Sequence, residues 1–469
     1  MEKKGLTGLE KFSYGIGAVG KDMVYMLSAS YILYYYQDIM GVSAVAMGVI
    51  LLIARIFDAF NDPVMGILVA KTKTKWGKFR PWLFIGTVTN AIILYLMFAA
   101  PPTMSGSGLV AYAAVTYILW GVTYTMMDIP YWSMIPAFTK SGSEREGMAA
   151  LGRSCAGVGS AVVSIFTVML VATLGKAFGD GTNNEMIGFK LVAAVVAVLF
   201  VVFILITCIN IKEKSTVDVE STSVKEMFSA LVQNDQAMAV VIAIVMINTA
   251  LYVTQNLVIY FFKYDFSGPD LWEAHYTMFN TFGGAFQILA MMVLFAILRK
   301  FMNTMRICEL SFGLAFVGYT LLLIIALAGW DSIYLLLVPA FLIMSCVGLL
   351  NVLVTIFLAN TVDYGELKND RRDESVIFSM QTFVVKFASG LSAFIASIVL
   401  QVSNISKDET TVVDIASSAS RNTLRFSMTI IPMICLAIGV FIFKKKYVLT
   451  DDKLEEITEQ LNARKANQA

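Results

Sequence analysis

The sequence contains little charge for its length. Only 15% of its 469 residues are Asp, Glu, Lys or Arg, whereas soluble globular chains carry roughly 25%. Instead, 58% of the residues are hydrophobic and the mean hydropathy is +0.72. A soluble core of this size does not need so much apolar sequence, so the composition predicts a polytopic membrane protein.

Histidine and cysteine are also scarce. His275 is the only histidine, and the sequence has no metal-ligand spacing, phosphate-cradling glycine loop or nucleophile elbow. The five cysteines are odd in number and lie in apolar segments, which argues against a disulfide framework and favours a packing role. The net charge of +1 indicates no particular partner. We therefore expect no cofactor and no nucleic-acid partner.

Long apolar segments fill most of the chain. A helix needs about 20 residues to cross a bilayer, and the sequence offers twelve segments of that length or more. An all-α membrane protein with twelve transmembrane helices is therefore predicted. The segments are 12–38, 43–70, 81–100, 109–138, 148–174, 187–211, 237–264, 271–298, 307–328, 333–361, 376–401 and 421–443.

The polar connections divide the chain and suggest an orientation. The longest, 212–236, separates an N-terminal six-helix half (1–211) from a C-terminal half (237–444), and a charged tail follows at 445–469. Basic residues gather in the even-numbered connections, with five of them in the 71–80 segment. By the positive-inside rule, both termini, the middle loop and the tail are expected in the cytoplasm.

One apolar segment carries four polar side chains within a short stretch, ARIFDAFNDP. Arg55, Asp58 and Asp62 have the spacing of one helix face, and Asp58 and Asp62 are i, i+4 neighbours. When two carboxylates lie so near each other, they need a shared proton, a basic partner or a metal cation. Because Asn61 adds another oxygen, a hard cation such as Na⁺ suits the group. The alternative is a buried salt bridge that fixes helix packing.

A second polar group combines carboxylates, basic side chains and aromatic rings. Asp128 can accept hydrogen bonds, and Trp132, four residues further on, offers a flat apolar face that could stack on a pyranose ring. This combination suits a neutral polyhydroxylated ligand, although Trp132 alone could belong to an interfacial aromatic belt. The members that we assign to it are Lys21, Asp22, Tyr25, Tyr124, Asp128, Trp132 and Arg153, and Thr125 lies among them.

The second half contributes fewer ionisable residues to its spans. Lys386 needs an anionic partner, for which Asp58 or Asp62 is the predicted candidate; the alternative is snorkelling to an interface. Further residues are predicted to act in coupling or gating together with Arg55 and Lys386. They are Gln381, Thr382, Asp363 and Arg372.

Several motifs, spread along most of the chain, are specific enough to indicate a protein family. They are SYGIGAVGKD, YYYQDIMG, ARIFDAFNDPVMG, WGKFRPW, YILWGVTYTMMDIPYWSMIP, ANTVDYGE and QTFVVK. With them the sequence resembles the melibiose permease type of sugar:cation symporter, in the glycoside-pentoside-hexuronide:cation family of the major facilitator superfamily. The resemblance implies the major facilitator fold, alternating access by rocking of the two halves, a functional monomer, and a place in the bacterial cell membrane.

The resemblance also implies roles for individual residues. Asp22 and Asp128 match the aspartates that hold galactosyl hydroxyls, and their neighbours Lys21, Trp132 and Arg153 would line the sugar site. Asp58 and Asp62 match the pair that binds Na⁺, Li⁺ or H⁺. Asn61 and Thr125 belong to or adjoin that cation site, and Lys386 matches a lysine near it.

The sequence therefore predicts a transporter that imports a galactoside, of the α-galactoside type such as melibiose, together with Na⁺ or H⁺. A carrier of a β-galactoside, a glucuronide or a pentoside remains an alternative within the family. An intramembrane aspartyl protease needs carboxylates on facing helices in motifs such as GxGD, which are absent. A polyspecific drug exporter would have an apolar cavity with few charges, unlike this sequence.

Overall fold

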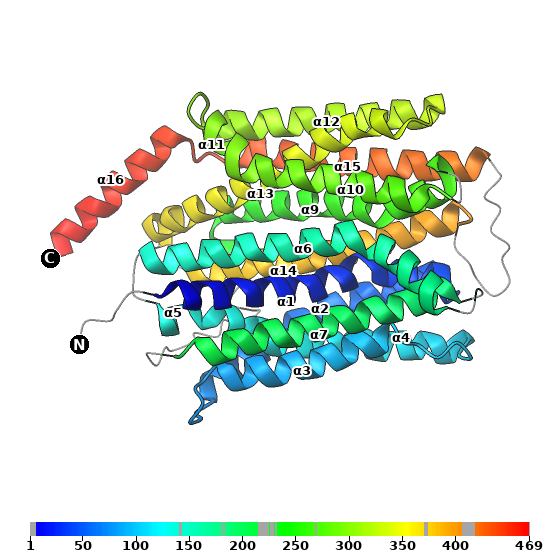
Figure 1. Cartoon of the computed structure of the whole chain (residues 1–469). Coiled ribbons are helices and arrows are strands. Elements are labelled where there is room, and N and C mark those ends of the chain that lie inside the picture. The colour runs from blue at the N-terminus through cyan, green and yellow to red at the C-terminus, as the bar shows by residue number, and fades with distance from the viewer. Residues whose placement is uncertain are drawn as a thin grey trace. The chain divides into compact units, whose positions relative to one another are not determined.

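The computed structural model describes residues 6–139, 143–179, 181, 183–213, 225, 229, 232–267, 270–369, 374–405 and 418–468. Its regular elements within these ranges are all helical (Figure 1), so the prediction of an all-α chain is confirmed. Each of the twelve predicted segments lies, to within a few residues at its ends, in one helix or in two or three consecutive helical elements. The charged tail forms a helix of its own, α16 (Asp451–Gln468).

The chain forms two compact units. The first is drawn from Met1–Ser221 and Asn404–Val413, and the second from Thr222–Ser403 and Asp414–Ala469. The helices of the first unit are α1 (Gly8–Tyr34), η1 (Tyr35–Ile39), α2 (Ala44–Lys71), α3 (Arg80–Met97), α4 (Gly106–Ser133), α5 (Ile135–Phe138), α6 (Ser143–Phe178) and α7 (Asn184–Asn210). Those of the second unit, besides α16, are α9 (Asp235–Phe261), η2 (Phe262–Phe266), α10 (Trp272–Leu289), η3 (Ala290–Leu294), α11 (Phe295–Leu298), α12 (Thr304–Ala328), α13 (Ile333–Asn369), α14 (Glu374–Val402) and α15 (Ser418–Lys446).

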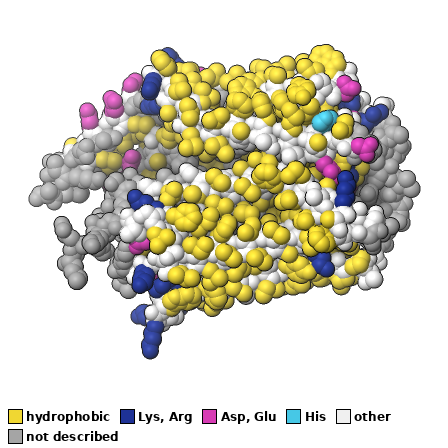
Figure 2. Space-filling model, viewed as in Figure 1, with side chains coloured by type: hydrophobic (Ala, Val, Ile, Leu, Met, Phe, Trp, Pro, Cys, Tyr) yellow, Lys and Arg dark blue, Asp and Glu magenta, His cyan; other side chains and the backbone are white. Residues whose placement is uncertain are grey.

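Most of the long helices suit a membrane. Among the described residues, eleven helices are long and apolar enough to cross one. The helix α1 has 27 residues and is also long enough, but it carries Lys21 and Asp22 near its middle and is not among the eleven. On the face shown in Figure 2, hydrophobic side chains cover the middle of the helices and charged side chains lie toward their ends. This pattern is typical of helices that contact lipid.

Close helix contacts in the first unit depend on small and capping residues. A Cβ atom added to Gly159 of α6 would lie 2.2 Å from the carbonyl oxygen of Val19, so only glycine permits this approach of α6 to α1. The Glu213 carboxylate, just after α7, accepts hydrogen bonds from the backbone N–H groups of Lys78, Phe79 and Arg80. A carboxylate at this position satisfies the first donors of α3 and complements its dipole.

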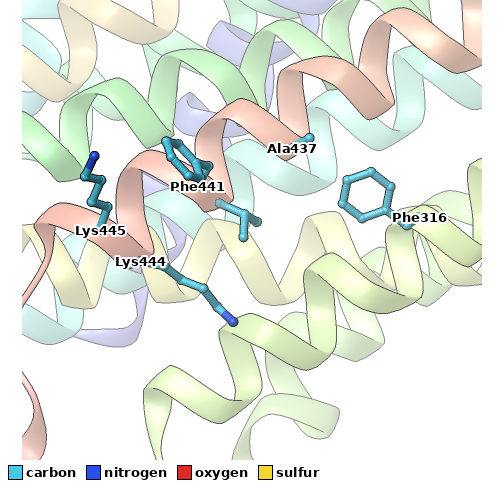
Figure 3. A pocket seen from close by; sticks show the side chains of 6 residues that line it. Phe316, Ala437, Phe441, Lys444 and Lys445 are labelled. Atoms are coloured by element: carbon cyan, nitrogen blue, oxygen red, sulfur yellow. The ribbon is translucent and has the colours of Figure 1, made fainter.

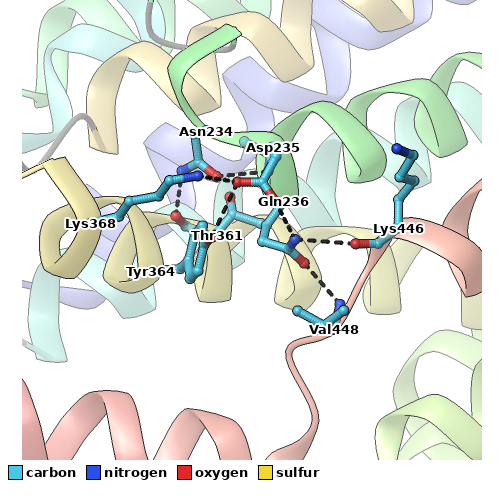
Figure 4. Close-up of polar contacts among 9 residues, drawn as sticks. Asn234, Asp235, Gln236, Thr361, Tyr364, Lys368, Lys446 and Val448 are labelled. Atoms are coloured by element: carbon cyan, nitrogen blue, oxygen red, sulfur yellow. Dashed lines mark hydrogen bonds and ion pairs between the residues drawn. The ribbon is translucent and has the colours of Figure 1, made fainter.

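Polar contacts in the second unit join the ends of three helices (Figure 4). Asn234 caps α9 and donates to the Thr361 carbonyl of α13 over 2.8 Å. Gln236 donates to the Lys446 carbonyl and accepts from the Val448 N–H, which fixes the chain where it leaves α15. The hydroxyl of Tyr364 and the ammonium of Lys368 both contact the Asp235 carboxylate. These contacts fix α9, α13 and α15 relative to one another at one end.

Candidate functional site

Lys21 joins two helices of the first unit. It is buried, and its Nζ lies 2.8 Å from Asp128 Oδ1 of α4 and 3.2 Å from Asp22 Oδ2 of its own helix. It also donates a hydrogen bond to the Tyr124 hydroxyl over 3.1 Å. Asp22 Oδ2 accepts no hydrogen bond from the described residues, so its contact with Lys21 is electrostatic. A buried carboxylate oxygen is thus left available to a hydroxyl donor.

An aromatic platform lies against these charges. The indole N–H of Trp132 donates to Asp128 Oδ1 over 3.1 Å, as the i, i+4 spacing of the two residues allows. The Arg153 guanidinium of α6 lies 4.4 Å from the centroid of the Trp132 ring and is exposed. We call the set Lys21, Asp22, Tyr124, Asp128, Trp132 and Arg153 the α1–α4 cluster.

A second set of polar side chains lies between α2 and α4. Arg55 and Asp58 are both buried, and Arg55 Nη1 lies 3.2 Å from Asp58 Oδ2. Asp62, one turn further along α2, accepts a hydrogen bond of 2.9 Å from the Thr125 hydroxyl of α4. The Nδ2 atom of Asn61 is buried without a hydrogen-bond partner among the described residues. We call Arg55, Asp58, Asn61, Asp62 and Thr125 the α2–α4 cluster.

Aromatic rings connect the two clusters. The Arg55 guanidinium lies 5.6 Å from the ring centroid of Tyr25 and 5.7 Å from those of Tyr117 and Trp120. Tyr25 in turn packs against Tyr124 of the α1–α4 cluster, with ring centroids 5.6 Å apart. The guanidinium is therefore held by cation–π contacts as well as by Asp58.

Gly121 lets α4 approach the Asp58 carboxylate. A Cβ atom added there would lie 2.5 Å from Asp58 Oδ1. The sequence did not predict a role for Gly121, Tyr117 or Trp120. Tyr117, Trp120 and Tyr124 follow one another at helical spacing on α4, and this aromatic stripe was the available signal. No sequence pattern indicated Gly121, because its role depends on the position of another helix.

The predicted residues of the second half lie in the second unit. Asp363 is half-buried on α13, and Gln381 and Lys386 are half-buried and buried on α14. The pairing of Lys386 with Asp58 or Asp62 stays a prediction. The side chain of Thr382 and the whole of Arg372 lie outside the described residues.

Comparison with protein families gives a match along nearly the whole chain. Residues 13–451 fit the family described as "MFS/sugar transport protein". The chain belongs to this family, so the predicted membership of a sugar:cation symporter family within the major facilitator superfamily is confirmed. It is a multi-pass membrane transporter and not an enzyme, and the intramembrane protease alternative is not favoured.

Individual relatives agree with the family. YagG of Escherichia coli (strain K12), a proposed glycoside/cation symporter, is 28% identical over 465 residues, which cover 99% of this chain and 96% of YagG. The isoprimeverose transporter of Lactiplantibacillus pentosus is 29% identical over 400 residues (83% of this chain, 79% of the transporter). The lactose permease of Lactobacillus helveticus is 25% identical over 473 residues (97% and 72%).

Solved structures share the fold at low sequence identity. The D-xylose-proton symporter superposes with a TM-score of 0.62 at 14% identity, covering 94% of this chain and 98% of the symporter. A bacterial homologue of the human lysosomal transporter Spinster gives a TM-score of 0.68 at 10% identity, with coverages of 94% and 98%. The predicted major facilitator fold is therefore confirmed.

Proposed function

We propose that the protein imports a galactoside, of the α-galactoside type such as melibiose, together with Na⁺, Li⁺ or H⁺, by alternating access. The observation that carries this proposal is the ion pair of Lys21 with Asp22 and Asp128, beside the Trp132 ring. It offers carboxylate acceptors for sugar hydroxyls next to an aromatic face for the apolar side of a pyranose ring.

The charges of the two clusters fit two different cargoes. In the α1–α4 cluster, Lys21 and Arg153 balance Asp22 and Asp128, so the cluster is neutral overall and suits an uncharged glycoside. A glucuronide would add an uncompensated negative charge there. In the α2–α4 cluster, Arg55 balances only one of Asp58 and Asp62. That cluster keeps one net negative charge and suits one monovalent cation.

The donor set of the α2–α4 cluster supports a hard cation. Asp58 and Asp62 supply carboxylate oxygens and Thr125 supplies a hydroxyl oxygen. The amide of Asn61 turned by 180° would place its oxygen where a nitrogen now lacks a partner, and the two orientations have the same shape. Oxygen ligands of this kind are what hard cations prefer.

The helix α4 contributes residues to both clusters and can therefore couple cation binding to sugar binding. Tyr124 of α4 faces Lys21, and the adjacent Thr125 contacts Asp62. A cation that fixes Asp62 and Thr125 would also fix α4 at Tyr124 and Asp128. Cation binding should therefore raise sugar affinity, and sugar should raise cation affinity by the same factor.

The names of two relatives support a disaccharide as the substrate. These names give lactose and isoprimeverose as substrates, which are disaccharides built of pyranose rings. A disaccharide glycoside is also what we propose for this chain, as a functional monomer in the cell membrane with both termini in the cytoplasm.

Sugar counterflow in reconstituted vesicles tests the substrate and the ion together. A panel of melibiose, lactose, a pentoside and a glucuronide should be assayed with and without Na⁺. Melibiose should exchange fastest, and Na⁺ should stimulate its exchange. Faster exchange of the glucuronide than of every neutral glycoside would refute the galactoside assignment.

The cation site has a separate test. Sugar binding to Asp58→Cys and Asp62→Cys variants should be measured with and without Na⁺. We expect both variants to bind sugar while losing the increase in affinity that Na⁺ gives to the wild type. If sugar affinity still rises with Na⁺ in both, the cation binds elsewhere.

A further inference from the structure

Two antiparallel helices of the second unit, α12 and α15, leave an open groove between them. At one end Lys444 Nζ lies 2.9 Å from Glu309 Oε1. About three turns further along both helices, the Thr320 hydroxyl contacts the sulfur of Met433. Between these contacts lies a space of about 520 Å³ (Figure 3). It is lined by Phe316, Ala437, Val440, Phe441, Lys444 and Lys445.

A small side chain helps to keep the groove open, because Ala437 of α15 contributes only a methyl group to its lining. The rim is apolar and faces away from the unit, since Phe441 is 64% exposed and Ile438 is 43% exposed. Because the groove is open on the outer face of a membrane-spanning helix pair, its occupant comes from the surrounding membrane.

Positive charge lies at one end of the groove only. Lys444 points toward α12, and Lys445 extends on the other side of α15, 5.7 Å from the Phe441 ring centroid (Figure 3). Arg306 is also exposed near this end, one turn before Glu309. The pair of Lys444 and Glu309 is about half exposed on both sides, and such pairs contribute little stability. Lys444 can therefore exchange this carboxylate for another anion.

We propose that this groove binds an anionic phospholipid. One acyl chain would lie along Phe316, Ala437 and Val440, and the phosphate would lie beside Lys444, with the charge of Lys445 at the same end of α15. The occupant must be apolar over most of its length and negatively charged at one end, as the groove requires. A zwitterionic lipid fits the apolar part equally well, but its ammonium group offsets the attraction to the lysines.

Native mass spectrometry of the purified full-length protein can test this proposal. Phosphatidylglycerol and phosphatidylcholine with the same acyl chains would be titrated separately. For the most tightly bound lipid molecule, the affinity of the wild type should be roughly tenfold higher for phosphatidylglycerol than for phosphatidylcholine, because each lysine near a lipid phosphate adds attraction. The Lys444→Gln/Lys445→Gln variant should lose most of that preference. Unchanged preference in this variant would overturn the proposal.

The matched control removes the same charge elsewhere. Lys73 and Lys75 are exposed in the connection between α2 and α3, and a Lys73→Gln/Lys75→Gln variant should keep the wild-type preference. An equal loss in this control would show that total charge, and not the groove, selects the lipid.

Two single variants separate the parts of the site. Glu309→Gln frees Lys444 and removes a competing carboxylate, so it should tighten phosphatidylglycerol binding several-fold, an effect that misfolding cannot produce. Ala437→Leu fills part of the groove and should weaken the binding of both lipids. The proposal is wrong if Ala437→Leu binds lipid normally or instead abolishes a dimer, which would make a second copy the occupant. Displacement of the lipid by inorganic phosphate alone would likewise reject it.

Discussion

The two clusters of the first unit share α4 but are connected to it by contacts of different strength. In the α1–α4 cluster an ion pair crosses between helices, since Lys21 of α1 lies 2.8 Å from Asp128 of α4. In the α2–α4 cluster the ion pair of Arg55 and Asp58 lies within α2. That cluster is joined to α4 by the hydrogen bond of Thr125 with Asp62.

This difference indicates at which helix contact the binding of a cargo can change how firmly two helices are held together. A buried ion pair that joins two helices holds them together before any cargo arrives, and removing one partner is costly. A single hydrogen bond from the Thr125 hydroxyl to the Asp62 carboxylate contributes only about 1.5–3 kcal/mol, so α2 and α4 can separate there more easily. A cation shared by Asp58, Asp62 and Thr125 would strengthen this weaker connection.

The largest change in ligand affinity is expected from a substitution in the α1–α4 cluster, whose ion pair joins two helices. Asp128→Ala leaves Lys21 with Asp22 and the Tyr124 hydroxyl, and it removes the acceptor of the Trp132 N–H. Sugar affinity, measured by equilibrium binding of a labelled galactoside, should fall by about a hundredfold or more. Na⁺ binding in the absence of sugar should change little. Asp331→Ala, at an exposed position, serves as the control, and sugar affinity like that of the wild type in Asp128→Ala would remove Asp128 from the site.

A smaller change in ligand affinity is expected when the net charge of the α2–α4 cluster changes. Arg55→Gln takes the α2–α4 cluster from one net negative charge to two, so Na⁺ affinity measured by calorimetry should rise about tenfold. A gating role for Arg55 predicts a different result, namely unchanged Na⁺ affinity with loss of counterflow. Arg299→Gln, which changes an exposed arginine of the second unit, should leave Na⁺ affinity as it is.

The smallest effect concerns the approach of α4 to α2. Gly121→Ala places a methyl group against Asp58 Oδ1, so the carboxylate must move and Na⁺ affinity should fall roughly fivefold at constant sugar affinity in the absence of Na⁺. Gly108→Ala changes the same helix at a position where an added Cβ meets nothing within 4 Å. Equal Na⁺ affinity in the two variants would show that Asp58 does not need this space.

Much of the fold and part of the candidate site could be predicted from local sequence. Length and hydropathy located the helices, because a helix must satisfy its own backbone in lipid. The spacing of Arg55, Asp58 and Asp62 placed them on one face of α2, and i, i+4 spacing brought Trp132 to Asp128. These relations lie within single helices, where the geometry is fixed by the backbone.

Contacts between helices required the tertiary structure. The sequence alone did not determine that Lys21 reaches Asp128, that Thr125 donates to Asp62, or that Gly121 faces Asp58. The same is true of the groove between α12 and α15, which depends on how the side chains of two distant segments meet. Helical spacing determines which side chains share a face, but the packing of one helix on another decides which charges pair and where space remains.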